Sequence, residues 1–382
     1  MSKYHALLSP SSSERWINCP GSVKAIVDAQ EKSLVRINKT SFYADEGTLA
    51  HELAEKTLTG SGNCFDYENV TLELENAIEV SREMCEYVQS YVDFVKLFDG
   101  DLRVEQRVYY TDWVPDGSGT SDAVIVQEDR LVCIDLKYGK GLMVSAEENT
   151  QALCYALGTY QGLSKEQREK IKTVLMVIHQ PRLDNVSEWE ISVADLLRRG
   201  EHIGQAAELA LTDDAPLRAG ESQCRWCPIN AMCPEQLRLA QETIGCEFDD
   251  LSSMSPVNLL SDEKLRLALD NKATIVAWLG AIEKMVSERL EDGGTFDGYK
   301  LVEGRSLRAW ADEQSASELL ELTLGDDAYT KKLLSPTQAE KALGKELSKG
   351  IQSLIVKPSG KPTLVHESDK RPSVQITVAD FD

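Results

Sequence analysis

The sequence predicts an α/β fold in which a central mixed β-sheet is flanked by helices, with a smaller and mainly helical C-terminal region. Helical and strand-like patterns alternate as far as Cys246, which indicates helices packed on a sheet. Beyond Cys246 the pattern changes to acidic helical stretches with breaks at Gly293-Gly294 and Pro336. We therefore expect one domain over residues 1–246 and an accessory region with a flexible tail over residues 247–382.

The individual elements follow from the spacing of apolar residues. Leu49, Leu53 and Leu58 recur at helical spacing, and runs rich in β-branched residues, bounded by polar turns such as Glu128-Asp129, are typical of strands. Two helices are thus expected before the sheet. The expected helices are residues 44–58, 72–98, 146–160 and 193–211, and the expected strands are residues 102–110, 120–127, 130–137, 172–179 and 187–191.

Composition and charge restrict the class of protein. With 42% hydrophobic and 27% charged residues, the chain has the balance of a globular protein, and it has no run of the roughly 18 apolar residues that a membrane helix needs. The N-terminus has neither the basic start nor the apolar core of a secretory signal. We therefore expect no membrane association and a cytoplasmic, reducing location, in which clustered cysteines indicate metal ligation.

The net charge of −22 requires that any contact with DNA be local. One candidate is the segment 331–361, in which seven lysines accompany only Glu340 and Glu346. A solvated helix face followed by a loop explains the same segment. The acidity also suits an alternative function, that of an acidic protein that binds partners or mimics DNA.

Two short segments carry the strongest chemical pattern, Gly119-Thr120-Ser121-Asp122 and Ile134-Asp135-Leu136-Lys137. Asp135 and Lys137 lie two apart on a predicted strand and leave the same face, while Asp122 lies on the neighbouring strand. Two carboxylates and a backbone carbonyl can hold Mg²⁺ or Mn²⁺, and a lysine beside them can orient water and stabilise charge on a phosphate. The alternative is an ordinary charged strand end.

Further residues flank this pattern along the chain. Gly47-Thr48-Leu49-Ala50-His51 puts a histidine on a predicted helix, and Gln151 and Tyr155 lie four apart on one face of another. Glu105, on the strand before Asp122, could add a carboxylate. Alone, a helical histidine is more often a surface or satisfied core residue, and a Gln/Tyr pair on one helix face is usually a packing contact.

Taken together, the order GxxxH, GxxD, DxK and QxxxY over residues 44–160 resembles the RecB-like branch of the PD-(D/E)XK nucleases. The resemblance implies a restriction-endonuclease-like core and hydrolysis of phosphodiester bonds, commonly from a DNA end, as in an exonuclease. It also implies the following roles: metal ligands His51, Asp122, Asp135 and the Leu136 carbonyl, catalytic lysine Lys137, and Gln151 and Tyr155 as supports of the site and the bound strand.

Three cysteines form a C-x2-C-x5-C pattern at Cys224, Cys227 and Cys233, and Cys19 is the candidate for a fourth ligand. This arrangement resembles the iron-sulfur nucleases of the same branch, including the AddB-type helicase-nucleases and those of CRISPR adaptation. The resemblance implies a [4Fe-4S] cluster that joins the two ends of the domain. Spacing alone allows a structural Zn²⁺ equally well. We expect the other cysteines to be buried small hydrophobic residues, namely Cys64, Cys85, Cys133, Cys154 and Cys246.

The whole chain also resembles a phage-encoded family of stand-alone RecB-like nucleases, on the basis of Arg15-Trp16-x-x-Cys19-Pro20 and of Gly304-Arg305-Ser306 after Gly298-Tyr299-Lys300-Leu301. That resemblance implies a role in phage DNA replication or recombination, with proteins of those processes as partners. Two alternatives stay open, a catalytically silent iron-sulfur module that binds DNA and a zinc-stabilised acidic protein that binds partners. The sequence leaves strand preference, polarity, endonuclease or exonuclease action and oligomeric state undecided.

Overall fold

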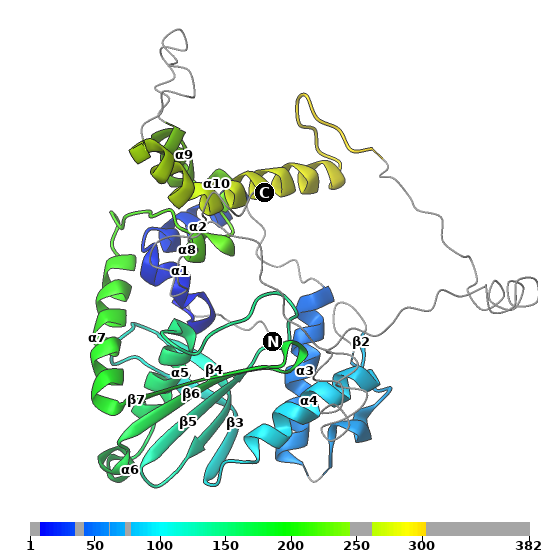
Figure 1. The fold of residues 1–382 in the computed structure, drawn as a ribbon, viewed down its shortest axis with the longest axis vertical. Coiled ribbons are helices and arrows are strands. Elements are labelled where there is room, and N and C mark those ends of the chain that lie inside the picture. The colour runs from blue at the N-terminus through cyan, green and yellow to red at the C-terminus, as the bar shows by residue number, and fades with distance from the viewer. Residues whose placement is uncertain (1–7, 35–41, 61, 73–77, 245–261, 303–382) are drawn as a thin grey trace, which may run out of the picture. The chain divides into compact units, whose positions relative to one another are not determined.

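The computed structural model describes residues 8–34, 42–60, 62–72, 78–244 and 262–302 (Figure 1). In chain order, with η for a 3-10 helix, its elements are η1 (Pro10–Ser12), α1 (Ser13–Asn18), α2 (Ser22–Glu31), α3 (Phe42–Thr59), η2 (Cys64–Tyr67), β1 (Thr71–Leu72), β2 (Ile78–Glu79), α4 (Arg82–Val95), β3 (Asp101–Tyr109), β4 (Ser118–Val126), β5 (Arg130–Leu136), α5 (Thr150–Gln161), α6 (Lys165–Lys170), β6 (Thr173–Gln180), η3 (Pro181–Leu183), β7 (Asn185–Ser192), α7 (Val193–Ala210), α8 (Glu221–Arg225), η4 (Asn230–Met232), α9 (Pro234–Ile244) and α10 (Asp262–Glu291).

A five-stranded mixed sheet in the order β3-β4-β5-β6-β7 forms the centre of the fold, as expected. The β5 and β6 strands are parallel, and the other neighbours are antiparallel. Parallel neighbours need a crossover connection, which here contains α5 and α6. The sheet is therefore an antiparallel hairpin series with one parallel step at its middle.

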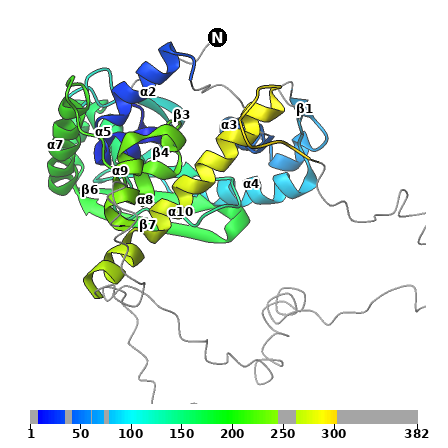
Figure 2. The same cartoon turned by 90° about the horizontal axis from the view of Figure 1, so that it is seen from above.

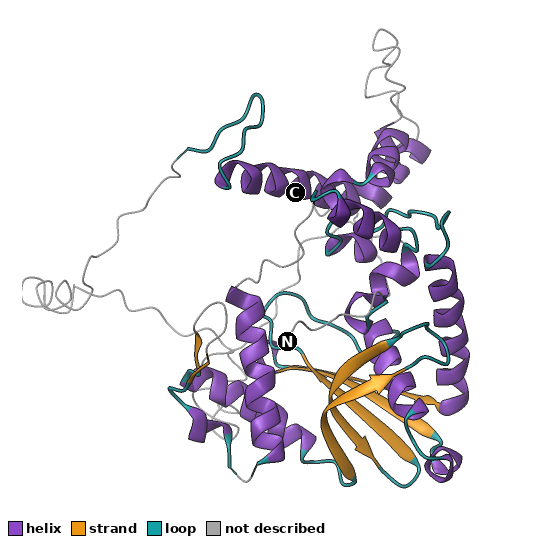
Figure 3. Ribbon diagram, turned by 180° about the vertical axis from the view of Figure 1, so that it is seen from behind, coloured by secondary structure: helices purple, strands orange, loops and turns teal. Residues whose placement is uncertain are grey.

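Both faces of the sheet are covered by helices, because alternate residues of the central strands are apolar on both sides. Val124 and Met176 pack with α5 and α7 in one hydrophobic cluster. Their neighbours along the strands, Ile125 and Val177, pack with α3 and α4 in a second cluster. Figures 1 and 3 show these two helix pairs on opposite sides of the sheet.

The five expected strands are all present within two residues of their expected bounds. Helix α5 begins later than expected because Asn149 caps it, its side chain accepting a hydrogen bond from the Ala152 N–H at 3.0 Å. The single helix expected over residues 72–98 is wrong in its first part. Residues Ile78–Glu79 pair with Thr71–Leu72 as a short hairpin, and α4 starts only after Ser81, whose hydroxyl accepts from Met84 N–H.

The N-terminal helices α1 and α2, which the periodicity did not predict, close one end of the α5–α7 face. Helix α1 packs against α5, α7 and α8. Trp16 of α1 is fully buried, and its indole N–H donates to the Ser9 carbonyl at 3.1 Å. The Tyr110 hydroxyl donates to the Leu8 carbonyl at 2.7 Å, which holds the start of this segment against the sheet.

The chain divides into two compact units, Met1–Gly294 and Thr295–Asp382. Helix α10 belongs to the first unit because it packs against α8, η4 and α9, as Figure 2 also shows. The domain boundary near residue 246 stays a prediction, and the lysine-rich segment 331–361 lies outside the described residues. No helix in the described part of the chain combines the length and apolarity that crossing a membrane requires.

We predict that Trp16→Ala lowers the free energy of unfolding by about 3–5 kcal/mol, because it removes a fully buried indole and leaves a cavity. The matched control is Trp226→Ala, since the Trp226 side chain is 81% exposed and its loss changes stability by about 0.5 kcal/mol or less. Urea unfolding followed by circular dichroism measures both. Equal midpoints for the two variants would show that α1 contributes little to the core.

Candidate functional site

Four elements bring a histidine and three carboxylates to one place beside the central strands. His51 comes from α3, Glu105 from β3, Asp122 from β4 and Asp135 from β5. His51 Nδ1 lies 3.3 Å from Asp122 Oδ1 and 3.9 Å from Glu105 Oε1. Ligand atoms of these three side chains lie within 4.8 Å of one another, the one such His/Cys/Asp/Glu group of three or more in the described part of the chain.

Glu105 joins this group through an unusual backbone conformation. It lies opposite Asp122, between the register pairs Val104–Ala123 and Gln106–Ser121. Its φ of +47° is in the left-handed region, which costs a non-glycine residue roughly 1–2 kcal/mol. Strain of this kind concentrates at functional sites. The sequence assigned Glu105 only a subsidiary place, and the pattern of β3 gave no signal of this turn in its backbone.

Asp122 is fixed by the neighbouring strand. The Leu136 N–H donates a hydrogen bond to Asp122 Oδ2 at 2.7 Å. This bond uses one carboxylate oxygen and leaves the other facing His51. Leu136, whose carbonyl was expected as a metal ligand, therefore lies beside the cluster at the end of β5.

Lys137 connects the carboxylates to α5 through a chain of polar contacts. Its ammonium lies 2.9 Å from Asp135 Oδ2 and donates to Gln151 Oε1 at 3.0 Å. The Gln151 amide in turn donates to the Tyr155 hydroxyl at 3.0 Å. Asp135 and Tyr155 are buried, so the chain of contacts holds the lysine in one position.

The electrostatics of the cluster favour positive charge. Burial lowers the pKa of His51, but the charges of Asp122, Asp135 and Glu105 outweigh burial and raise that pKa to about 9. Burial likewise opposes the charge of Lys137, and Asp135 and Asp122 nevertheless raise its pKa. Burial raises the pKa of Asp135, an effect that Lys137 opposes and Asp122 strengthens. A divalent cation would therefore replace a proton on His51 in a site already arranged for positive charge.

Gly47 and Gly119, the two glycines of the sequence pattern, differ in their surroundings. A Cβ atom on Gly119 would lie 2.7 Å from Pro10 Cγ and 2.9 Å from Tyr155 Cε1, so only glycine lets Tyr155 pack where it does. A Cβ atom on Gly47 would meet nothing within 4 Å. Gly47 precedes His51 by four residues, so it leaves open space on the helix face that carries the histidine.

Helix α3 is held over the sheet by a part-buried ion pair. Arg182 in η3 donates to Glu46 of α3 at 2.7 Å, and the two side chains are only 9% and 19% exposed. The Arg182 guanidinium also lies over the Tyr138 ring, 4.7 Å from its centroid. These contacts tie the N-terminal half of α3, the helix that carries His51, to η3, which directly follows β6.

The four cysteines expected as cofactor ligands lie where the N-terminal helices meet the segment after α7. Cys19 follows α1 and Cys224 lies in α8, two elements that pack together. Burial raises the pKa of Cys19 and Cys224, and the charge of Cys233 raises both further. Burial likewise raises the pKa of Cys227 to about 11, with Arg15 opposing and Cys224 and Cys19 adding to the rise. The thiols of Cys19, Cys224 and Cys227 therefore each lie close enough to another cysteine of the set for its charge to raise their pKa.

Backbone groups already point at these sulfurs. The Arg218 N–H donates to Cys19 Sγ at 3.2 Å, and the Gly220 N–H donates to Cys224 Sγ at 3.4 Å. Such N–H donors stabilise thiolates that ligate metal. The donor set and its environment thus fit a thiolate-bound group. Of the cysteines expected to be buried and unligated, Cys64, Cys85, Cys133 and Cys154 are buried, and Cys246 lies outside the described residues.

Among the described residues, the four thiols do not form a set of three as close together as the ligands of a bound zinc ion. Zn–S bonds of about 2.3 Å in a tetrahedron put the sulfurs roughly 3.8 Å apart. Across the described ranges, which include all four cysteines, no three of these thiols come within 4.8 Å of one another. A four-iron cluster, with one thiolate on each iron, holds its sulfurs farther apart.

Fold and site together define an α/β protein whose helix-flanked mixed sheet carries a histidine–carboxylate–lysine cluster. The chain belongs to the family described as "Protein of unknown function (DUF2800)", whose model matches residues 5–372. A similar solved structure is that described as "Crystal structure of SSO0001", which is 17% identical and covers 50% of this chain and 95% of its own, with a TM-score of 0.24. That likeness carries no argument about the site.

We predict that the four cysteines together bind one metal ion or cluster. Substituting two of them should therefore lower the free energy of unfolding no further than substituting one. Closing a loop of about 200 residues restricts the unfolded chain by on the order of 4 kcal/mol. Cys19→Ser and Cys233→Ser should each lower the unfolding free energy by about 2–4 kcal/mol, and the double variant should lose the same amount. Thermal unfolding and elemental analysis for iron and zinc measure this. Additive losses with unchanged metal content would exclude a shared group.

Proposed function

We propose that this protein is a divalent-metal-dependent DNA nuclease with a PD-(D/E)XK core of the RecB-like branch. The observation that supports it most is the convergence of residues from four elements, α3, β4, the end of β5 and α5, into one cluster. His51, Asp122, Asp135, Lys137 and Gln151 were selected from separate stretches of sequence, and they meet at the end of β5. If these residues were only an ordinary charged strand end, no histidine from α3 and no glutamine from α5 would be expected to contact them.

In this proposal His51, Asp122 and Glu105 hold Mg²⁺ or Mn²⁺, with Asp135 and the Leu136 carbonyl as the further ligands that the resemblance implies. The ion supplies Lewis acidity toward a phosphate. Imidazole and carboxylate donors suit Mn²⁺, and carboxylates and a carbonyl suit Mg²⁺. Glu105 therefore adds a ligand to the set that the sequence predicted.

The residues of the chain itself orient the reacting groups. The Lys137 ammonium uses two of its three N–H groups on Asp135 and Gln151, so its third can donate a hydrogen bond to a non-bridging phosphate oxygen or to a water molecule. Tyr155 fixes the Gln151 amide, so that the lysine keeps one orientation as charge develops on the phosphate. Lys137 is thus the group whose loss should affect rate more than metal binding.

We propose an iron-sulfur cluster rather than zinc as the group that the four cysteines hold, because the C-x2-C-x5-C pattern with a distant fourth cysteine resembles that of the iron-sulfur nucleases. Its role in the proposal is structural, because it would join α1 and α8 rather than contact the candidate catalytic residues. A role in phage replication or recombination, with proteins of those processes as partners, rests on resemblance alone. Action on DNA ends, cytoplasmic location and oligomeric state stay predictions.

The decisive experiment is cleavage of end-labelled single- and double-stranded DNA by the anaerobically purified protein with Mg²⁺ or Mn²⁺. Lys137→Ala should lower the rate at least about a hundredfold, because it removes a positioned donor, while Mn²⁺ affinity measured by calorimetry stays close to that of the wild type. Asp122→Asn should lower affinity and rate together. The matched control is Lys140→Ala, since Lys140 is exposed and pairs loosely with Glu83 at 3.7 Å.

Two outcomes would contradict the proposal. One is a wild-type protein that holds its cofactor yet cleaves none of the substrates, and DNA binding without cleavage would then indicate the silent iron-sulfur module. The other is cleavage by Lys137→Ala at the rate of the wild type. A zinc-loaded protein that neither binds nor cleaves DNA would instead favour the acidic partner-binding alternative.

We also predict that Gly47→Ala separates stability from activity. Alanine favours a helix interior by about 0.5–1 kcal/mol over glycine, and a Cβ at this position meets no neighbouring atom. The variant should therefore be more stable, yet cleave DNA more slowly, because its methyl group occupies space in front of His51 that a DNA backbone needs. Thermal unfolding and the cleavage assay test the two parts. A more stable variant with full activity would show that Gly47 does not border the bound substrate.

A further inference from the structure

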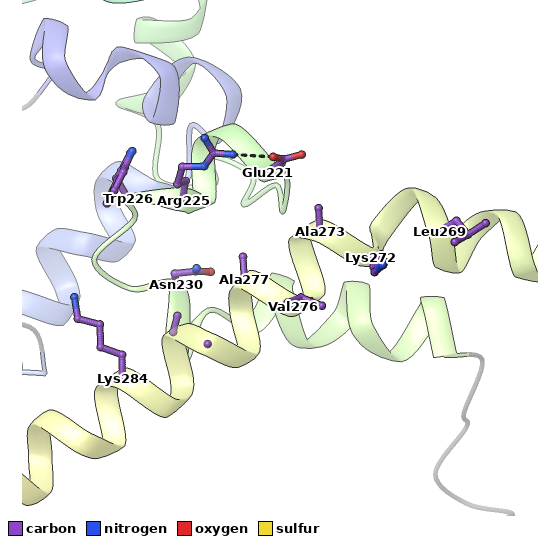
Figure 4. A pocket seen from close by; sticks show the side chains of 12 residues that line it. Glu221, Arg225, Trp226, Asn230, Leu269, Lys272, Ala273, Val276, Ala277 and Lys284 are labelled. Atoms are coloured by element: carbon purple, nitrogen blue, oxygen red, sulfur yellow. Dashed lines mark hydrogen bonds and ion pairs between the residues drawn. The ribbon is translucent and has the colours of Figure 1, made fainter. Parts of the chain in front are cut away.

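A groove of about 790 Å³ runs between α10 and the segment that begins at α8 (Figure 4). On the α10 side its lining residues repeat every three or four positions, which makes one continuous helix face. From Leu269 to Lys284 this face extends for about 22 Å at 1.5 Å per residue. The opposite wall includes Arg225, Trp226 and Asn230.

The chemistry of the groove is unusual for this chain. Its floor on α10 consists of small and apolar side chains, among them Ala273, Val276 and Ala277. Trp226, on the facing wall, is 81% exposed. So exposed an indole contributes little to packing among the described residues. Packing therefore does not explain why a tryptophan stands between Cys224 and Cys227.

The lining of this groove holds more cations than carboxylates, although the protein carries a net charge of −22. The lining has three cations, Arg225, Lys272 and Lys284, and one carboxylate, Glu221. Arg225 pairs with Glu221 at 2.7 Å, and Lys284 lies 3.8 Å from Glu288 on its own helix. Lys272 makes no ion pair with any described residue. The groove therefore fits an anionic ligand with flat apolar faces.

We propose that this groove binds a single strand of nucleic acid, with a base stacked on Trp226 and phosphates beside Lys272 and Lys284. Flat bases and a charged backbone match both parts of the lining, as on other surfaces that hold single strands. A duplex would present its phosphates and leave the apolar floor unused. This inference rests on the proposed nuclease function. It assigns the groove along α10 to the binding of the substrate strand, apart from the cluster at the end of β5.

The test measures binding of a fluorescently labelled 15-nucleotide oligothymidylate by anisotropy, in EDTA so that no cleavage occurs. Trp226→Ala should weaken binding about tenfold, because one base can no longer stack on the indole. Trp226→Phe should restore most of the affinity, because a base can still stack on the phenyl ring. The visible absorption of each variant checks that the adjacent cysteines keep their cofactor.

Charge is tested separately on α10. Lys272→Glu should weaken binding. It should also reduce the slope of a plot of log affinity against log salt concentration, by roughly 0.7 for each phosphate that the protein no longer neutralises. The matched control is Arg266→Glu, an equal change of charge at an exposed position of α10 outside the groove. It should leave both quantities close to those of the wild type.

The outcomes separate this inference from the nuclease proposal. If the wild type binds and cleaves DNA but Trp226→Ala and Lys272→Glu bind as the wild type does, the groove is not the strand site and the nuclease proposal stands. If the wild type neither binds nor cleaves, both fail. If the groove variants instead change a dimer into a monomer and leave DNA binding unchanged, the groove is a contact between copies and the inference is wrong.

Discussion

The concentration of negative charge at the end of β5 is the constraint on which the site depends. Three carboxylates from three adjacent strands lie within reach of one histidine and one lysine, partly out of contact with water. Such an arrangement is unfavourable unless positive charge enters it, either as protons or as a bound cation. The raised pKa of His51, the ion pair of Lys137 and the hydrogen bond from Leu136 to Asp122 are all responses to that constraint.

Because the cluster draws on α3, β3, β4, β5 and α5, its geometry is a property of the tertiary structure. The short parallel step between β5 and β6 requires α5 to cross over the sheet, and this brings Gln151 and Tyr155 back to Lys137. On the other side, the pairing of Arg182 with Glu46 keeps α3 close enough for His51 to reach the strands. Precision at the site thus comes from packed, rigid elements rather than from loops.

The sequence predicted the sheet well because each strand has a distinct apolar run bounded by polar turns. It also selected the residues that meet in the cluster, since Asp122, Asp135 and Lys137 lie on strands whose side chains alternate regularly. It underestimated Glu105, because a left-handed residue inside a strand leaves no periodic signal. The groove along α10 was missed for another reason, since its two walls come from segments almost 40 residues apart whose packing no local pattern records.

The enclosure of Trp16 and Cys19 by much later parts of the chain affects how the protein can be made. Helix α1 precedes its neighbours α5, α7 and α8 along the chain by up to about 200 residues. At translation rates of 5–20 residues per second, that interval lasts roughly 10–40 s. During it, the Trp16 indole and the Cys19 thiol lack the partners that bury them in the folded protein. The N-terminal segment can therefore complete its packing only after α8 has been synthesised, and a nascent chain that stops before residue 224 can bring α1 against α5 and α7 but lacks Cys224.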